Sequence, residues 1–293
     1  MKRTIFLTGA SSSLGLEFYE NFKDEYIIYR IYRNINKLSI NEFNVDLTNK
    51  SSIESVFSSL GKIDAILHFS AQPTVWKSIK DPLSDAYANI ISTLNLLDLA
   101  VQFKINNFVF TSSESVYGDF TSPNESTLKK PNNPYGISKY TCENYIRFFK
   151  NKYNLNAIII RPSFVISPNM NRNPLYDILS NFKAGKVNLF QSIKSNYNFV
   201  LASTVCGVIN DILLKNIDIS EINVVNKINT SLSEVIKYLK NDGHKFDVVS
   251  NEDKIVNQTL DSLNQDLFLQ YENDIFKFCD NYIKNKIKWD SKI

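Results

Sequence analysis

Short apolar runs alternate with longer amphipathic segments over the first half of the chain. The runs are Thr4–Leu7, Tyr26–Tyr32, Phe43–Val45, Ile63–Phe69, Asn107–Thr111 and Ala157–Ile160. The helix-length segments between them are Leu14–Phe22, Ser51–Leu60, Leu83–Phe103 and Ile137–Tyr153. Strands separated by helices of this length predict parallel βαβ units. Because the strands are apolar without alternation, we expect a sheet that is covered on both faces.

Beyond Pro162 the alternation becomes less regular. The elements expected here are helices at Asn171–Ala184, Ser203–Leu214, Leu232–Leu239 and Glu272–Ile287 and a strand at Ile222–Val225. In the last helix Ile275, Phe278, Tyr282 and Ile283 share one face, so we expect this helix to pack against the rest of the protein. We predict an α/β protein with a doubly wound parallel sheet over residues 1–162. A small C-terminal lobe, interleaved with the last strands, is expected over residues 163–293.

Composition and charge exclude several classes of partner. The 293 residues carry 33 basic and 30 acidic side chains, a formal net charge of +3. So small an excess gives no footprint for a nucleic acid polymer or an anionic membrane. No stretch approaches the roughly 20 apolar residues that cross a bilayer. The apolar run at the start of the chain stops at Gly9, too early for a signal peptide.

Cysteine usage indicates the redox compartment. Cys142, Cys206 and Cys279 lie far apart, and no cluster of Cys or His accompanies them. An odd number at these spacings predicts neither a disulfide framework nor a zinc site. We therefore expect reduced thiols, a cytoplasmic protein and no bound metal.

The first predicted strand leads into Thr8-Gly9-Ala10-Ser11-Ser12-Ser13-Leu14-Gly15, just ahead of the first predicted helix. In a Rossmann fold this turn holds the pyrophosphate of a dinucleotide against backbone N–H groups at the helix N-terminus. The middle glycine of the pattern is replaced by Ser12 or Ser13, which fits if the φ of that residue is negative. A serine-rich turn without a ligand is the alternative for this segment alone. The residues expected to contact the phosphates are Gly9, Ser11, Ser12, Ser13, Leu14 and Gly15.

The end of the second predicted strand bears on the choice of cofactor. NAD-binding proteins tend to place Asp or Glu there, where the carboxylate holds the 2′-hydroxyl of the ribose. No carboxylate lies between Glu25 and Glu42, whereas Arg33 follows the strand and can pair with a 2′-phosphate. This favours NADP(H), with NAD(H) possible; a solvated arginine is the alternative for Arg33. Asp46 and Leu47 end the third strand, at a place suited to contact adenine.

Tyr135 and Lys139 are four residues apart in a predicted helix and therefore share one face. A tyrosine with a pKa of about 10 is a poor base at neutral pH. A nearby ammonium favours the phenolate and lowers the pKa of the phenol. The tyrosine can then exchange a proton with a hydroxyl or ketone while a nicotinamide exchanges hydride. Tyr-x-x-x-Lys is frequent by chance, but here Thr111-Ser112-Ser113-Glu114-Ser115 precedes it, at the end of the fifth predicted strand.

These ordered motifs give the chain a resemblance to the extended short-chain dehydrogenase/reductase family. That family includes sugar-nucleotide epimerases, dehydratases and 4-ketoreductases. The resemblance runs from Thr4 to about Lys215. It is carried by the glycine loop, Asp46-Leu47, His68 to Pro73, Asn89, the Ser-Ser-x-x-Val-Tyr-Gly of residues 112–118, Pro134 to Lys139 and Arg161-Pro162-Ser163.

The resemblance implies a sugar-nucleotide substrate, a substrate-binding C-terminal lobe and a role for each matching residue. Ser113 would orient the substrate, Tyr135 would be the acid/base, and Lys139 would lower the pKa of Tyr135 and hold the nicotinamide ribose. Further cofactor contacts would come from Phe69, Ser70, Ala71, Asn89, Thr111, Pro162 and Ser163, and further substrate contacts from Gln72, Glu114 and Ser115. Family members often dimerise through the helices matching Leu83–Phe103 and Ile137–Tyr153, so we expect a homodimer.

The sequence also departs from the family pattern. Besides the missing loop glycine, Ile166-Ser167-Pro168 replaces a Tyr-Gly-Pro, and Ser203-Thr204 replaces an acidic pair before a late helix. The C-terminal part is also short for the family. We therefore expect a pared-down sugar-nucleotide pocket.

Four functions are compatible with these residues. We rank them by the catalytic residues and the cofactor that each function requires. A 4-ketoreductase needs only Ser113, Tyr135, Lys139 and exchangeable NADPH, so reduction of a nucleotide-linked 4-keto-(6-deoxy)sugar is the first expectation. A sugar-nucleotide 4-epimerase uses the same residues with retained NAD and is the alternative. A 4,6-dehydratase ranks lower, because such enzymes carry an acid and a base after the catalytic hydroxyl, whereas Glu114 is followed by Ser115. The alternative from a different class is a non-catalytic dinucleotide sensor, which usually lacks the Tyr/Lys pair.

Overall fold

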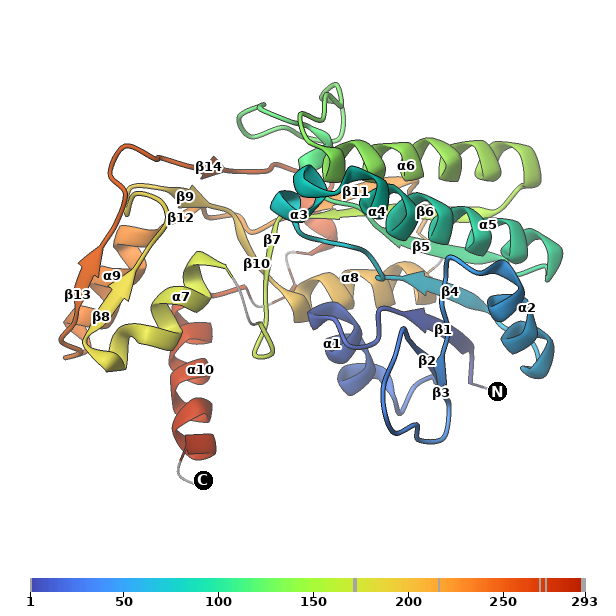
Figure 1. The fold of residues 1–293 in the computed structure, drawn as a ribbon, viewed down its shortest axis with the longest axis horizontal. Coiled ribbons are helices and arrows are strands. Elements are labelled where there is room, and N and C mark those ends of the chain that lie inside the picture. The colour runs from blue at the N-terminus through green and yellow to red at the C-terminus, as the bar shows by residue number, and fades with distance from the viewer. Residues whose placement is uncertain (1, 171–172, 216, 269, 272, 291–293) are drawn as a thin grey trace.

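The computed structural model describes residues 2–170, 173–215, 217–268, 270–271 and 273–290, with side chains up to residue 285. Within these residues, seven parallel strands form a central sheet in the order β11-β6-β5-β4-β1-β2-β3 (Figure 1). They are β1 (Thr4–Thr8), β2 (Ile27–Tyr32), β3 (Glu42–Asn44), β4 (Ala65–His68), β5 (Asn107–Thr111), β6 (Asn156–Pro162) and β11 (Glu221–Val224). The order reverses between β1 and β4, which confirms the predicted doubly wound Rossmann-type fold.

Helices cover both faces of this sheet (Figure 1). On one face α1 (Ser13–Phe22) and α8 (Ala202–Lys215) pack together over Ile5 and Leu7 of β1. The other face carries α2 (Lys50–Ser59), α5 (Ser92–Gln102) and α6 (Pro134–Tyr153), whose apolar side chains join Phe6 in a second core. Burial on both sides explains why the strands read as continuous apolar runs.

The helix predicted at Leu83–Phe103 is confirmed, but it is not a uniform α-helix. Instead, α4 (Pro82–Ala86) is followed by a π-helix, η1 (Tyr87–Ile91), and then by α5. A further helix that was not predicted, α3 (Val75–Lys80), precedes them. One wide turn is hard to detect from the sequence, because the apolar positions on either side of it keep nearly the same face.

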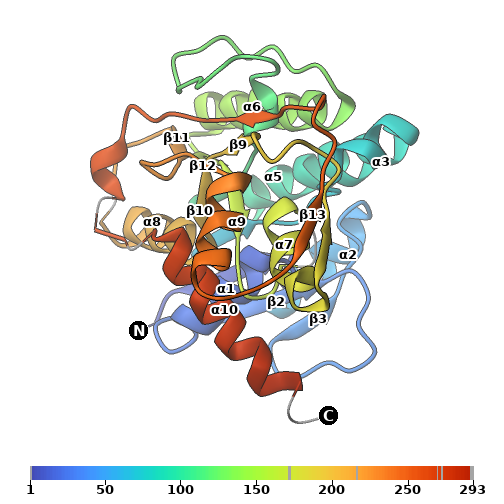
Figure 2. The ribbon, with the colours of Figure 1, turned by 90° about the vertical axis from the view of Figure 1, so that its left-hand side faces the viewer.

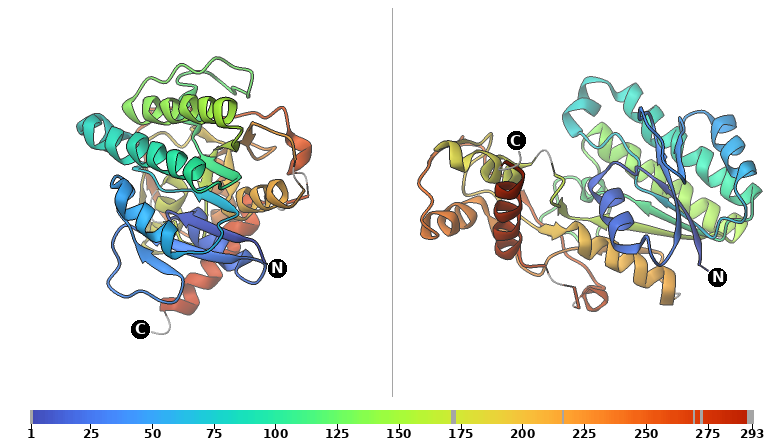
Figure 3. Two further views of the ribbon diagram at one scale, coloured as in Figure 1. Left: turned by 90° about the vertical axis from the view of Figure 1, so that its right-hand side faces the viewer. Right: turned by 90° about the horizontal axis from the view of Figure 1, so that it is seen from below.

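A smaller C-terminal lobe lies to one side of the sheet (Figures 1 and 3). Its helices are α7 (Pro174–Asn181), η3 (Phe182–Ala184), α9 (Leu232–Asn241), η4 (Gln265–Leu267) and α10 (Ile275–Asp290). Its strands are β7 (Phe164–Ile166), β8 (Lys186–Asn188), β9 (Asn196–Tyr197), β10 (Phe199–Leu201), β12 (Thr230–Ser231), β13 (Asp247–Val249) and β14 (Asn257–Gln258). Between them the chain returns to the Rossmann part as α8 and β11, so the two parts are interleaved in sequence.

The lobe has an apolar core of its own, which α7, α9 and α10 share with β10 (Figure 2). Ile275, Phe278 and Ile283 of α10 are buried there, which confirms the predicted packing of the last helix. The helix expected at Asn171–Ala184 begins at Pro174; Asn171 and Arg172 lie outside the described residues. The strands of the lobe were not predicted, because two or three residues are too few to show a period.

Candidate active site

The predicted site residues follow the carboxyl ends of neighbouring parallel strands. Thr8 of β1 pairs in register with His68 of β4, His68 with Phe110 of β5, and Thr111 with Ile160 of β6. The loops after these strands therefore open at one edge of the sheet, on either side of the point where the strand order reverses. Open α/β sheets bind their ligands at this position.

The loop between β1 and α1 has the backbone that its sequence predicts. Gly9 has a φ of 67°, and a Cβ there would lie 2.6 Å from the backbone nitrogen of Ser70. A Cβ on Gly15 would lie 2.3 Å from the carbonyl oxygen of Gly9, so both positions require glycine. Ser12 has a φ of −74°, which a serine adopts without strain, and its hydroxyl accepts the N–H of Gly15 at 3.1 Å.

The loop after β4, Phe69–Gln72, is fixed from both ends. The N–H of Ser70 donates to the Thr8 hydroxyl at 3.3 Å, and the N–H of Gln72 donates to the side-chain oxygen of Asn89 at 2.8 Å. The amide nitrogen of Asn89 donates in turn to the Ser138 hydroxyl at 3.0 Å. Asn89 is 2% exposed and its side chain is engaged with protein groups, so it supports this loop from behind.

Arg33 and Asp46 occupy the neighbouring ends of β2 and β3. Arg33 is exposed. Asp46 accepts the N–H and the hydroxyl of Thr48 at 2.9 and 2.7 Å. These hydrogen bonds and the charge of Arg33 lower the pKa of Asp46. The next residue, Leu47, is held by its carbonyl, which accepts the amide of Asn95 at 3.0 Å. A carboxylate is therefore present near the end of β2, although β3 supplies it.

Tyr135 and Lys139 lie in the first turns of α6 and are 8% and 3% exposed. The Lys139 ammonium donates to the carbonyl of Thr111 at 2.7 Å, which ties α6 to the end of β5. Burial lowers the pKa of this ammonium to about 8, and nearby acidic groups oppose the shift. The N–H of Tyr135 donates to the hydroxyl of Ser78 in α3 at 3.0 Å. Sequence reasoning missed Ser78, because α3 itself was not predicted.

Ser113 follows β5 and caps the short helix η2 (Glu114–Val116). Its hydroxyl accepts the N–H of Ser115 at 3.2 Å and donates to the Ser115 hydroxyl, also at 3.2 Å. Ser115 therefore shapes the turn that presents Ser113. At the end of β6, Ser163 follows Pro162 and donates to the side-chain oxygen of Asn198 at 2.8 Å. Asn198 belongs to the C-terminal lobe, so the lobe meets this edge of the sheet directly.

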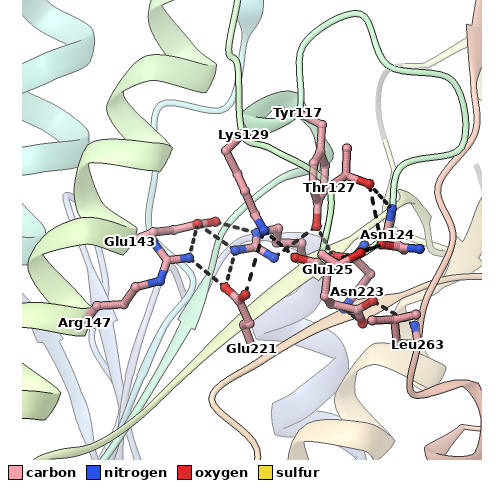
Figure 4. Close-up of polar contacts among 12 residues, drawn as sticks. Tyr117, Asn124, Glu125, Thr127, Lys129, Glu143, Arg147, Glu221, Asn223 and Leu263 are labelled. Atoms are coloured by element: carbon pink, nitrogen blue, oxygen red, sulfur yellow. Dashed lines mark hydrogen bonds and ion pairs between the residues drawn. The ribbon is translucent and has the colours of Figure 1, made fainter.

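A buried ion network lies behind the site, and sequence reasoning missed it (Figure 4). Arg161 of β6 donates to both carboxylate oxygens of Glu143 of α6, each at 2.7 Å, and both side chains are fully buried. Glu143 also accepts the hydroxyl of Ser112 at 2.6 Å, and Arg161 donates to Glu221 of β11 at 2.6 Å. The network joins α6 to the strand that leads into Ser113. The spacing of Glu143, four residues after Lys139, could have placed it on the same helix face.

Glu125 anchors the long loop between η2 and α6 (Figure 4). Its carboxylate is 7% exposed and accepts the N–H of Asn223, the hydroxyl of Ser262 and the N–H of Leu263, each at 2.8 Å. This one carboxylate therefore binds together the loop, β11 and a segment of the C-terminal lobe. No sequence motif marked it.

The edge fits a dinucleotide. The first N–H groups of α1, including those of Ser13 and Leu14, have no partner within the helix and suit an anionic pyrophosphate. Among the described residues, the buried hydroxyl of Thr111 has no hydrogen-bond partner in the protein.

Over all the residues that the structure describes, no cluster of three or more His, Cys, Asp or Glu side chains could hold a metal ion. No helix that the structure describes is long and apolar enough to cross a membrane.

The chain is similar in sequence and in fold to known proteins. A curated relative, a putative UDP-glucose 4-epimerase of Methanocaldococcus jannaschii, is 30% identical over 171 residues, which are 55% of each chain. The chain thus spans about half the length of this relative.

Two solved structures share the fold over nearly their whole length. They are a UDP-glucose 4-epimerase of Thermotoga maritima with UDP-glucose (TM-score 0.84, 21% identity, 97% of this chain and 99% of the other) and a UDP-glucuronic acid 4-epimerase of Bacillus cereus with UDP-glucuronic acid and NAD (TM-score 0.83, 20% identity, 96% and 99%).

A family profile settles the relationship. The profile of the NAD dependent epimerase/dehydratase family matches residues 5–224, which is more than half of the chain. The matched stretch includes the glycine loop, the Ser113 turn, Tyr135 and Lys139, and it ends with β11 at the last strand of the sheet. The chain therefore belongs to the NAD-dependent epimerase/dehydratase family.

Proposed function

We propose that the protein is an NAD-dependent sugar-nucleotide 4-epimerase. The observation that carries the proposal is the bond between Lys139 on α6 and the end of β5, the strand that leads into Ser113. It connects the helix of Tyr135 with the turn of Ser113, and a phenol, a hydroxyl and an ammonium suffice for the proton transfer that would accompany hydride exchange between one carbon and a bound nicotinamide. Of the proteins named above, one is a putative UDP-glucose 4-epimerase and two are 4-epimerases of known structure, which supports the alternative over the 4-ketoreductase that ranked first.

In the proposed reaction Tyr135, as the phenolate, accepts the proton of the 4-hydroxyl as hydride leaves C4. It returns that proton to the same oxygen when hydride is added to the opposite face of the 4-ketone. Ser113 hydrogen-bonds this oxygen, and the Lys139 ammonium stabilises the phenolate because an opposite charge lowers the pKa of the phenol. Bound NAD supplies the acceptor and donor of hydride. The configuration at C4 is inverted, and no cofactor is consumed.

The proposed cofactor is NAD, in place of the NADP(H) that Arg33 favoured. A 4-epimerase returns the hydride to the same sugar, so it has no need of the reducing cofactor pool. The Bacillus cereus relative is described with NAD bound. The carboxylate of Asp46 lies close enough to Arg33 for the charge of Arg33 to lower the pKa of Asp46. That carboxylate disfavours a second negative charge, such as a 2′-phosphate, beside it.

We further propose a homodimer in the cytoplasm. Large apolar side chains are exposed on α4, η1 and α6, where Leu83 is 67%, Tyr87 55%, Ile137 50% and Phe148 54% exposed. These helices lie in one layer (Figure 1), and a surface with this many exposed apolar groups suits association. A molar mass of twice the 33.7 kDa chain in light scattering would support the dimer. The buried thiols fit a reducing compartment.

Tyr135→Phe tests the reaction. We expect conversion of UDP-glucose to UDP-galactose by the NAD-loaded protein, followed by chromatography, to fall by about 10²–10⁴-fold in kcat in the variant, because the acid/base is lost. NAD binding, measured by titration calorimetry, should be retained. Full activity in the variant would contradict the proposed role of Tyr135. Absence of C4 inversion in the wild-type protein with any of several UDP-sugars would contradict the function.

A further inference from the structure

Glu114 connects the catalytic turn with the C-terminal lobe. It comes directly after Ser113, begins η2 and is partly buried. Its carboxylate accepts the side-chain amide of Gln258 in β14 at 3.2 Å. β14 runs beside β9 with Gln258 opposite Tyr197, and Tyr197 is 2% exposed. The carboxylate therefore lies where the lobe closes against the residue that is proposed to bind the 4-oxygen of the sugar.

No positive charge compensates this carboxylate. Among the ion pairs of the described residues, none includes Glu114. Burial raises the pKa of Glu114 to about 7, and no Lys or Arg opposes the shift. The pKa of the neighbouring Tyr197 is raised by burial and also by the charge of Glu114. Among the described residues, Glu114 therefore has no cationic partner at ion-pair distance.

The substrates of 4-epimerases differ at a carbon close to the reacting one. In a pyranose whose 4-oxygen meets Ser113, the substituents on C3 and C5 flank that oxygen. UDP-glucose carries a hydroxymethyl group on C5, whereas UDP-glucuronate carries a carboxylate there. Charge acts over several ångströms in a site shielded from water, so a carboxylate on the residue next to Ser113 opposes a second carboxylate on the sugar.

We propose that Glu114, held by Gln258, selects a neutral sugar nucleotide such as UDP-glucose and rejects its uronate. This inference rests on the proposed 4-epimerase function and adds the substrate class. A hydroxymethyl group can donate to the Glu114 carboxylate or accept from the Gln258 amide. A uronate would meet the like charge of Glu114, a carboxylate that burial alone perturbs and that forms no ion pair among the described residues. Selectivity then depends on a repulsive element as much as on attractive contacts.

The experiment compares kcat/KM for UDP-glucose and UDP-glucuronate at pH 8, where Glu114 is ionised, with NAD-loaded full-length protein. We expect the wild-type ratio to favour UDP-glucose by roughly 100-fold, since like charges in contact cost several kcal/mol. In Glu114→Gln, which keeps the shape and removes the charge, the ratio should fall at least tenfold. Glu54→Gln is the matched control: Glu54 on α2 also accepts a glutamine amide, from Gln102 at 2.8 Å, and its ratio should equal that of the wild type.

The outcomes separate the two proposals. C4 inversion with a wild-type ratio near one, or in favour of the uronate, would overturn the role of Glu114 and leave the 4-epimerase function standing. An unchanged ratio in a folded Glu114→Gln variant would do the same. No C4 inversion of these two or of other UDP-sugars by the wild-type protein would overturn the proposed function and this inference with it.

Discussion

The Rossmann part and the C-terminal lobe position their side chains in different ways. In the Rossmann part β1, β4, β5 and β6 are almost wholly buried and run side by side in one sheet, so the sheet fixes where each following loop begins. The lobe has strands of two or three residues in separate small sheets, and single side chains such as Glu125 and Asn198 join it to the rest. The comparison teaches that a continuous sheet positions the residues of the proposed chemistry, whereas single side-chain contacts across the chain hold the lobe against them.

The largest stability effect is expected where the Rossmann part is most constrained, at the fully buried pair of Arg161 and Glu143. Arg161→Met removes the buried partner of the Glu143 carboxylate and leaves it paired with the partly exposed Arg147. We expect the free energy of unfolding, measured by urea denaturation, to fall by about 3–5 kcal/mol. Activity should fall as well, because Glu143 also holds Ser112, the neighbour of Ser113.

Arg147→Met is the matched control, since Arg147 donates to the same Glu143 and to Glu221. Its side chain is 35% exposed, so the loss should be no more than about 1 kcal/mol. Equal losses for the two variants would contradict the view that burial, and not the number of ion pairs, makes this network important.

The same contrast explains what could be predicted from the sequence. The strands of the sheet, the glycine loop and the pair Tyr135 and Lys139 were predictable, because each rests on local periodicity or on a spacing within one helix. The π-helix at Tyr87–Ile91 was not predictable, since one wide turn leaves the apolar pattern of the helices on either side nearly unchanged. Gln258 was beyond reach because it meets Glu114 from a strand of two residues, 144 positions away in the chain. Contacts of that kind follow from the assembled fold and leave no pattern in the sequence.

A smaller effect on stability, together with a loss of NAD affinity, is expected from a substitution in the glycine loop between β1 and α1. Gly15→Ala brings a Cβ to 2.3 Å from the carbonyl oxygen of Gly9, so α1 must move away from the loop. Overpacking of this kind costs typically about 1–3 kcal/mol, and we expect a loss of NAD affinity of roughly tenfold or more in titration calorimetry. Gly61→Ala serves as the control, because a Cβ at Gly61 meets nothing within 4 Å. An unchanged affinity in Gly15→Ala would argue against the loop as the pyrophosphate site.

The smallest effect, on NAD affinity, is expected from substitution of Arg33. This residue directly follows β2, and it is the residue from which the sequence favoured NADP(H). Arg33 is exposed, and NAD offers no 2′-phosphate for it to bind, so Arg33→Ala should change NAD affinity by no more than about threefold. Its effect on NADP should be larger and in the direction of weaker binding, because the guanidinium of Arg33, whose charge reaches Asp46, could balance the phosphate. We therefore expect titrations of both cofactors to show that the wild type binds NAD more tightly than NADP, and that the ratio of the two affinities is larger in Arg33→Ala. A wild type that prefers NADP, with the preference abolished in Arg33→Ala, would instead restore the reductase. It would also show that one side chain after β2 can determine which cofactor binds, and with it which reaction the protein catalyses.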